Sequence, residues 1–178
     1  MQFQWPSVLL LGLLLAVGSV RAEAFELGLL AGTARLEQAL TGTQASFEPA
    51  FGIAGREELS SRFAFFGDAV VTSTETVERG DAGLLVLRAG VEMDLQRRQP
   101  GGWTAVLGVG YTWIDFDRGA GYSNGLYSLG LGQRFVYDWG VLFWQARADM
   151  TVSRSTWYKT LNDGKLLAGC AWKIPIGR

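Results

Sequence analysis

The chain of 178 residues contains no histidine, which restricts the chemistry it can perform. Without histidine there is no Ser-His or Cys-His nucleophile arrangement and no histidine-ligated metal site. Asp115, Asp117 and Asn124 flank Gly119 and Gly121 and carry oxygen ligands, but their spacing does not follow a calcium-binding EF-hand loop. We interpret these residues as part of a solvated loop. The sequence therefore predicts no catalytic residue, no cofactor and no bound metal.

The glycine pairs and the single cysteine add no further chemistry. Gly108 with Gly110, and Gly130 with Gly132, lie inside apolar runs and lead into no predicted helix. A phosphate-binding glycine loop opens a helix, so this site is not predicted. Glycine inside a strand instead indicates curvature or a close approach of the backbone. Cys170 is the only cysteine, which excludes an internal disulfide.

The charged residues fall on one side of a two-residue repeat. Along residues 83–95, large apolar residues such as Leu87 and Val91 alternate with Arg88 and Glu92. The other runs show the same pattern, and no charge falls among their large apolar residues. The charged face holds seven basic and six acidic residues: Arg56, Arg62, Arg88, Arg134, Arg147, Lys165 and Lys173 with Glu26, Glu48, Asp68, Glu92, Asp94 and Asp149.

These runs predict eight β-strands. A period of two residues indicates strands, and no segment keeps a helical period. Runs of about ten residues separated by turn residues are typical of transmembrane β-barrels. We predict an all-β fold, an eight-stranded antiparallel up-and-down transmembrane β-barrel within residues 23–178. Its strands lie near 25–35, 47–56, 62–73, 83–95, 103–115, 124–137, 140–152 and 164–176.

Aromatic residues bracket the apolar face. The predicted aromatic girdle comprises Trp103, Trp113, Tyr127, Tyr137 and Trp172. The ten-residue spacing from Trp103 to Trp113 projects to roughly 25 Å along the axis of a tilted strand, which matches the apolar band of an outer-membrane barrel. The opposite face of this hairpin is small, so the large side chains are expected to face lipid. A soluble β-sandwich or lipocalin-like carrier is the alternative.

The N-terminal segment predicts a signal peptide over residues 1–22. The apolar run from Val8 to Val20 is shorter than the about 20 residues of a membrane-spanning helix. Ala22 and Ala24 are small residues that allow cleavage after either one. A formal net charge of -1 without a basic run gives nucleic-acid binding no support. A secreted barrel is expected in the bacterial outer membrane.

The lengths of the predicted connections indicate an orientation. The first, third, fifth and seventh connections are longer than the second, fourth and sixth, and the sixth is only Asp138 and Trp139. Outer-membrane barrels have short periplasmic turns and longer external loops. Both termini are therefore expected on the periplasmic side.

With these features the chain resembles the small outer-membrane β-barrel superfamily typified by the OmpA transmembrane domain and OmpX. The resemblance is architectural and covers nearly all of the chain after the predicted signal peptide. Gly169, Trp172 and Ile174 partly match the family's C-terminal assembly signal, although the usual terminal aromatic residue is absent. The resemblance implies contact with outer-membrane lipid and lipopolysaccharide, insertion by the barrel-assembly machinery, and a monomer. The histidine-dependent lipid A chemistry of some relatives does not carry over.

The predicted function is a non-catalytic outer-membrane barrel with surface-exposed loops and a structural or surface-interaction role. A lipid-modifying enzyme without histidine and a small channel are the alternatives. Eight strands leave an interior that side chains just fill, so the inward charges predict a polar plug. Strand pairing sets Asp68 beside Arg88 and Glu26 near Lys173, and Arg88→Ala is predicted to cost more than the double change with Asp68→Ala. The predicted plug is Asp68, Arg88, Glu92, Asp94, Arg134, Arg147, Asp149, Glu26 and Lys173.

Overall fold

The structure is a computed structural model that describes residues 24–36, 46–76, 80–96, 102–152 and 161–175. All eight predicted strands are present, each within three residues of its predicted bounds. The predicted signal peptide, residues 1–22, lies outside the described residues and stays a prediction. The strands are β1 (Ala24–Leu36), β2 (Ser46–Glu58), β3 (Phe63–Thr76), β4 (Gly80–Asp94), β5 (Gly102–Phe116), β6 (Tyr122–Tyr137), β7 (Gly140–Val152) and β8 (Leu161–Pro175).

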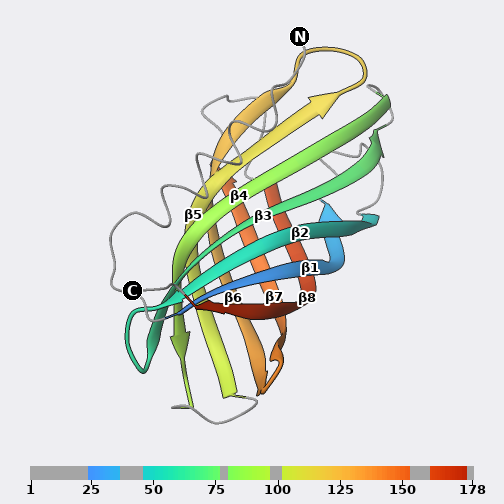
Figure 1. The fold of residues 1–178 in the computed structure, drawn as a ribbon. Helices are drawn as coiled ribbons and strands as arrows, with labels where there is room; N and C mark the ends of the chain where they lie inside the picture. The colour runs from blue at the N-terminus through green and yellow to red at the C-terminus, as the bar shows by residue number, and fades with distance from the viewer. Residues whose placement is uncertain (1–23, 37–45, 77–79, 97–101, 153–160, 176–178) are drawn as a thin grey trace.

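The strands form one closed antiparallel barrel, in which each strand pairs with its neighbours in the chain and β1 pairs with β8 (Figure 1). This confirms the predicted up-and-down barrel. We call the end where Ala24 of β1 pairs with Pro175 of β8 the base, and the opposite end the rim. The β2–β3, β4–β5 and β6–β7 connections also lie at the base.

Among the described residues, no helix is long and apolar enough to span a membrane.

The pairing register tilts the strands. A path across directly paired residues leaves β5 at Thr104, crosses the seven other strands and returns to β5 at Ile114, ten residues nearer the rim. An eight-stranded barrel with this stagger has strands inclined by about 40° and an interior that side chains fill. The tilt brings residues that are not paired in the sheet to the same height inside the lumen.

Side chains alternate between the lumen and the outside. On β5, Val106 is 2% exposed, whereas its neighbour Leu107 is 65% exposed. Glycine on the inward face lets adjacent strands curve tightly. A Cβ added at Gly110 would lie 2.0 Å from the backbone oxygen of Leu87 on β4. A larger residue at position 110 would therefore force β4 and β5 apart.

The connections differ from the predicted alternation of lengths. The β3–β4 hairpin continues to Thr76 and Gly80, so a connection predicted to be long spans only residues 77–79. The β4–β5 connection at the base spans residues 95–101. The hairpin is longer than predicted because residues 73–76 keep an extended conformation and Gly80, at φ 72°, begins the return strand. The predicted alternation therefore fails at the β3–β4 and β4–β5 connections, and the periplasmic position of the termini stays a prediction.

Candidate functional site: the interior charge network

Nine charged side chains and one amide meet inside the barrel. Every strand except β5 contributes from its inward positions, which alternate along the chain as in Gln145, Arg147 and Asp149 on β7. The set is joined by ion pairs and hydrogen bonds, and we call it the interior charge network. Its members are Glu26, Arg56, Asp68, Arg88, Glu92, Arg134, Gln145, Arg147, Asp149 and Lys165.

Two aspartates near the middle of the barrel each bind two cations. Arg88 donates from Nε to Asp68 Oδ1 at 2.8 Å and from Nη1 to Asp149 Oδ2 at 2.7 Å. Arg147 pairs with Asp68, and Lys165 Nζ lies 2.7 Å from Asp149 Oδ2. These five side chains are at most 3% exposed. The structure thus places Asp68 opposite Arg88 in register and joins them, as strand pairing predicted, but each aspartate has a second partner.

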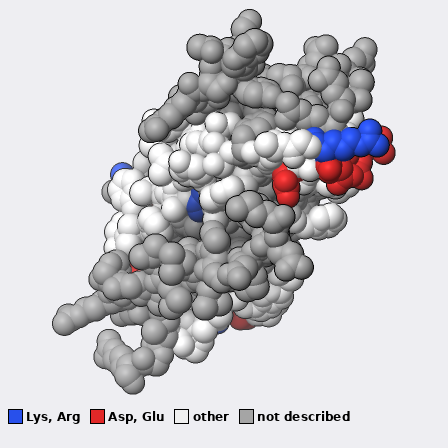
Figure 2. Space-filling view, turned by 90° about the horizontal axis from the view of Figure 1, so that it is seen from above, with Lys and Arg blue, Asp and Glu red and all other residues white. Residues whose placement is uncertain are grey.

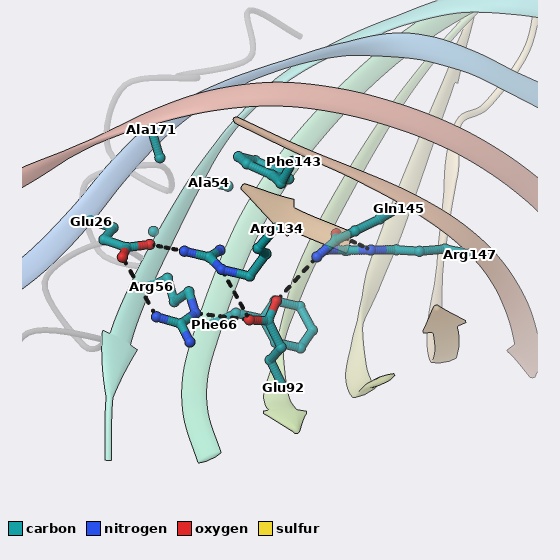
Figure 3. A pocket seen from close by; sticks show the side chains of 11 residues that line it. Glu26, Ala54, Arg56, Phe66, Glu92, Arg134, Phe143, Gln145, Arg147 and Ala171 are labelled. Atoms are coloured by element: carbon teal, nitrogen blue, oxygen red, sulfur yellow. Dashed lines mark hydrogen bonds and ion pairs between the residues drawn. The ribbon is translucent and has the colours of Figure 1, made fainter. Parts of the chain in front are cut away.

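A second group lies nearer the base. Arg56 Nε donates to Glu92 Oε1 at 2.8 Å, and Arg56 Nη1 lies 3.6 Å from Glu26 Oε1. Arg134 pairs with Glu26, and its Nε lies 3.7 Å from Glu92 Oε1. Figure 3 shows these four side chains converging across the lumen. Each arginine contacts both glutamates, so the loss of either glutamate leaves two cations with one carboxylate.

Gln145 and Arg147 join the two groups. Gln145 Nε2 donates to Glu92 Oε2 at 3.2 Å, and Arg147 Nε donates to Gln145 Oε1 at 3.0 Å. The Arg147 guanidinium also lies over the ring of Phe66, 4.9 Å from its centroid, where the aromatic face attracts a cation. Strand periodicity placed Gln145 inward but did not indicate its role. The predicted partners were matched by opposite charge, and an amide side chain has no charge.

The network is close to electrically balanced, with five cations and four carboxylates. At its base, Arg56 also lies 3.3 Å from Glu58, whose side chain is 67% exposed. Isolated charges inside a closed lumen are costly unless they are paired and hydrogen-bonded. The pairing therefore lets these charged residues lie inside the barrel at a lower cost in free energy.

Two residues of the predicted plug lie outside this network. Lys173 is directly paired with Glu26 in the sheet, but its side chain is exposed at the base, and the carboxylate binds arginines instead. Asp94 ends β4 at the base and accepts a hydrogen bond from the backbone nitrogen of Gln96 at 2.9 Å. Both positions have inward parity and lie near the mouth, where Lys173 is exposed and Asp94 is half-buried.

Arg62 and Glu48 also had inward parity in the sequence. Arg62 is exposed in the β2–β3 turn, because β3 begins after it at Phe63. Glu48 is half-buried near the rim and accepts a hydrogen bond from Thr74 Oγ1 at 3.1 Å. Alternation along the strand therefore shows whether a side chain points inward or outward. The height of the residue along the tilted strand decides whether an inward side chain joins the network.

The space between the side chains at the base is small. A cavity of about 20 Å³ lies between the two charged groups, and this volume admits about one water molecule. Around this cavity, the described part of the base half is closely packed with paired side chains. The cavity is lined by Glu26, Ala54, Gly55, Arg56, Phe66, Glu92, Arg134, Phe143, Gln145, Arg147 and Ala171.

Towards the rim the lumen changes character. From Arg88 towards the rim, the inward residues of β4 are Val86, Leu84 and Ala82. Each of these three is at most 3% exposed. The buried apolar cluster continues across the barrel through other strands. It includes Leu30, Val70, Leu84, Ile114 and Leu167, with small residues such as Ala34 and Ala50.

The predicted aromatic girdle lies on the outside of the barrel. The exposed fractions are 38% for Trp103, 57% for Tyr127, 47% for Tyr137 and 45% for Trp172, and Trp113 is partly exposed. These side chains stand where a polar interface and an apolar layer would meet.

One polar residue interrupts the apolar outer face of β6. Gln133 accepts a hydrogen bond on Oε1 from Trp144 Nε1 at 3.1 Å. Trp144 packs edge to face against Trp103, with ring centroids 5.6 Å apart. Gln133 is directly paired with Trp103 near the base end of β5, so it belongs to the girdle rather than to the middle of the apolar band.

The geometry of the network supports a structural role. Its carboxylates are held by arginine or lysine, so they are poorly suited to accept a proton from a substrate. Among the described residues, no group of three or more Cys, Asp or Glu side chains could hold a metal ion. Asp115 and Asp117 are exposed near the rim.

No protein-family model matches the chain, and no curated protein matches its sequence. Similar solved structures exist. Neisserial surface protein A (NspA) aligns with a TM-score of 0.67 at 16% identity, covering 84% of this chain and 97% of that protein. Ail, the attachment invasion locus protein of Yersinia pestis, aligns with a TM-score of 0.55 at 15% identity, covering 85% of this chain and 97% of Ail.

These likenesses show the fold. The chain has the architecture of the small eight-stranded outer-membrane β-barrels, which confirms the resemblance to the OmpA and OmpX superfamily at that level. A structure of Ail in complex with the heparin analogue sucrose octasulfate aligns equally well, with a TM-score of 0.55 at 14% identity and coverage of 85% of this chain and 97% of Ail.

Proposed function

We propose that the protein is a non-catalytic integral barrel of the bacterial outer membrane, with a closed lumen and a structural or surface-interaction role. The observation that carries this proposal is the inversion of polarity across the wall. Leu107 and Leu129 are 65% and 64% exposed on the outside, whereas the side chains of Arg88 and Asp149 are at most 1% exposed inside. Such an apolar belt is expected to be covered by lipid. The likeness to NspA and Ail supports the same location.

The proposed orientation sets the base in the periplasm and the rim outside the cell. The tight β6–β7 turn, in which Tyr137 pairs with Gly140, supports this orientation. On β8, the outward side chains of Trp172 and Ile174 are exposed and available to the barrel-assembly machinery. Outer-membrane lipid and lipopolysaccharide would then surround a monomeric barrel.

The rim favours cationic over anionic partners. Among the described rim residues, the exposed acidic side chains are Glu75, Asp81, Asp115 and Asp117, and the exposed basic ones are Arg35 and Arg118. Figure 2, which views the molecule from above, shows acidic and basic side chains gathered along one edge of the described surface. The sulfated ligand seen with Ail would be repelled by this balance of charge. A surface role for this chain therefore points to a positively charged partner.

Membrane location is tested by fractionation and by gel migration. The protein is expected in the outer-membrane fraction, to require detergent for extraction, and to migrate differently before and after heating in dodecyl sulfate. Recovery from the aqueous fraction without detergent would instead establish the soluble carrier alternative.

Orientation is tested by cysteine labelling in a Cys170→Ser background. Ser60 lies in the β2–β3 turn at the base, and Arg118 lies at the rim. A membrane-impermeant maleimide is expected to label Arg118→Cys in intact cells and Ser60→Cys only after lysis. The reverse pattern would place the base outside.

The closed lumen is tested in planar bilayers. Because paired side chains fill the base half, wild-type protein is expected to show no stable resolved single-channel current. A steady conductance would instead support the channel alternative.

A further inference from the structure

One carboxylate of β2 lies on the outer wall of the barrel. The predicted second strand stops short of Glu57, but β2 extends to Glu58 and brings Glu57 into the wall between β1 and β3 (Figure 1). Glu57 is directly paired with Phe25 on β1 and with Phe65 on β3. Directly paired residues share one face of a sheet, and Phe65 is paired in turn with the exposed Val91. The Glu57 side chain therefore takes the outward face.

The Glu57 carboxylate is buried without a partner. Glu57 is only 7% exposed, and its Oε1 atom has no hydrogen-bond donor among the described residues. None of the ion pairs in the described part of the chain includes this residue. Burying a carboxylate oxygen without a donor is costly in free energy. A donor from outside the chain would therefore stabilise this position.

Aromatic rings flank this carboxylate. A Cβ added at Gly55, the next outward position of β2 towards the rim, would lie 2.6 Å from Cζ of Phe25. The Phe25 ring thus lies over Gly55, between Glu57 and the middle of the apolar belt. Phe65 flanks Glu57 on the other neighbouring strand. Because aromatic rings attract cations as a carboxylate does, these three side chains together favour an ammonium group.

Glu57 lies at the height of the girdle at the base. The row of directly paired residues that begins at Trp172 on β8 passes through Leu27 on β1 and reaches Gly55 on β2. Rows climb towards the rim in this direction by ten residues over eight strands, so two strands correspond to between two and three residues. Glu57, two residues nearer the base than Gly55, is therefore level with Trp172. Lipid head groups lie at the level of such a girdle, and an outward charge costs little there.

We propose that Glu57, together with the Phe25 and Phe65 rings, binds the primary ammonium group of a zwitterionic phospholipid in the leaflet at the base. A primary ammonium has a positive charge and three N–H donors, so it can donate to the carboxylate while it contacts the rings. A choline head group has the same charge but no N–H donor. Both rings are half-buried, so a small shift of either one opens the carboxylate to the lipid layer. This inference rests on the membrane location proposed above and adds the class of lipid.

Contact is tested by chemical coupling on the full chain in vesicles of phosphatidylethanolamine and phosphatidylcholine. Dicyclohexylcarbodiimide, an apolar reagent, activates a carboxylate. Attack by the lipid amine then forms an amide and releases dicyclohexylurea. Tandem mass spectrometry is expected to place a lipid adduct at Glu57, and vesicles of phosphatidylcholine alone should give none. An inserted wild-type protein without this adduct at Glu57 would overturn the proposal.

Selectivity is tested by native mass spectrometry of the full chain in nonionic detergent, which counts bound lipids one by one. Wild-type protein is expected to bind its first phosphatidylethanolamine roughly tenfold more tightly than phosphatidylcholine with the same acyl chains. Glu57→Gln keeps the size of the side chain but removes its charge, and should abolish this preference. Glu58→Gln is the matched control, because the neighbouring carboxylate is 67% exposed at the mouth, and should keep it.

The outcomes separate this site from the membrane location. A chain that fails to insert into vesicles would refute both proposals. Inserted wild-type protein with equal affinity for the two lipids, or Glu57→Gln with the full preference, would refute the ammonium site alone. Glycerophosphoethanolamine, which has the head group without acyl chains, should bind far more weakly; equal binding would overturn the assignment to a lipid. If Glu57→Gln does not fold, the adduct at Glu57 of the wild-type protein decides.

Discussion

The base half and the rim half of the lumen are filled in different ways. The base half contains the interior charge network, in which every carboxylate meets at least two cations. The rim half contains mainly apolar and small side chains, with the hydroxyls of Thr72 and Thr74 among them, and β4 passes from charged to apolar residues between Arg88 and Val86. Paired charges depend on specific partners, whereas apolar side chains depend mainly on volume. The two halves should therefore respond differently to substitution.

The largest effect is expected from Asp68→Ala. This change leaves Arg88 and Arg147 buried without their shared carboxylate, and the network then holds five cations against three carboxylates. Breaking a buried pair in this way costs about 3 to 5 kcal/mol. Urea unfolding in lipid vesicles measures the loss. The control is Thr104→Ala, since the buried Thr104 hydroxyl has no hydrogen-bond partner among the described residues.

Arg88→Ala is expected to cost less than Asp68→Ala. Each aspartate keeps one cation, Arg147 or Lys165, and the network becomes balanced at four charges of each sign. The shared partners revise the expectation from strand pairing alone, which treated Asp68 and Arg88 as an isolated pair. A double-mutant cycle of the two residues should show coupling, and additive losses would refute the shared network.

The next largest effect concerns the outer wall. Leu107→Arg places a charge near the middle of the apolar belt, which is expected to cost about 2 to 4 kcal/mol. Leu107→Met keeps the side chain apolar at similar volume and should be nearly silent. Insertion into vesicles measured by gel shift distinguishes them, and equal insertion of both variants would argue that this face does not contact lipid.

In the rim half, Leu84→Ala is expected to cost about 2 to 3 kcal/mol, because Leu84 is 3% exposed in the apolar cluster. Leu84→Met should cost under about 1.5 kcal/mol, since volume is nearly conserved. The same urea assay applies. A loss from Leu84→Met as large as that from Asp68→Ala would remove the contrast between the two halves.

The smallest effect is expected at the mouth of the base. Glu58 contacts Arg56 at 3.3 Å, but its side chain is 67% exposed and is hydrated in both folded and unfolded states. Glu58→Gln should therefore change the free energy of unfolding by under about 1 kcal/mol. A loss of several kcal/mol would show that the network extends beyond the enclosed lumen.

Some residues of the interior charge network were predicted from the sequence, whereas the exposure of others was not. The two-residue period placed Asp68, Arg88, Arg147 and Asp149 on one face, and all four are buried inside the barrel. The same period also placed Lys173 on that face, yet it is exposed at the base. The two-residue period shows which face of the wall a side chain takes, but it does not show the height of that side chain along the barrel axis. The height depends on the strand tilt and on where each strand ends.

The sequence by itself determined the strands, the face that each side chain takes and the antiparallel pairing of chain neighbours, because these follow from local alternation and short connections. Tertiary structure decided which charges meet across the lumen. Arg134 on β6 reaches Glu26 on β1, and Arg147 on β7 reaches Asp68 on β3. The stagger of ten residues around the closed wall sets these heights, and closure is a property of all eight strands together.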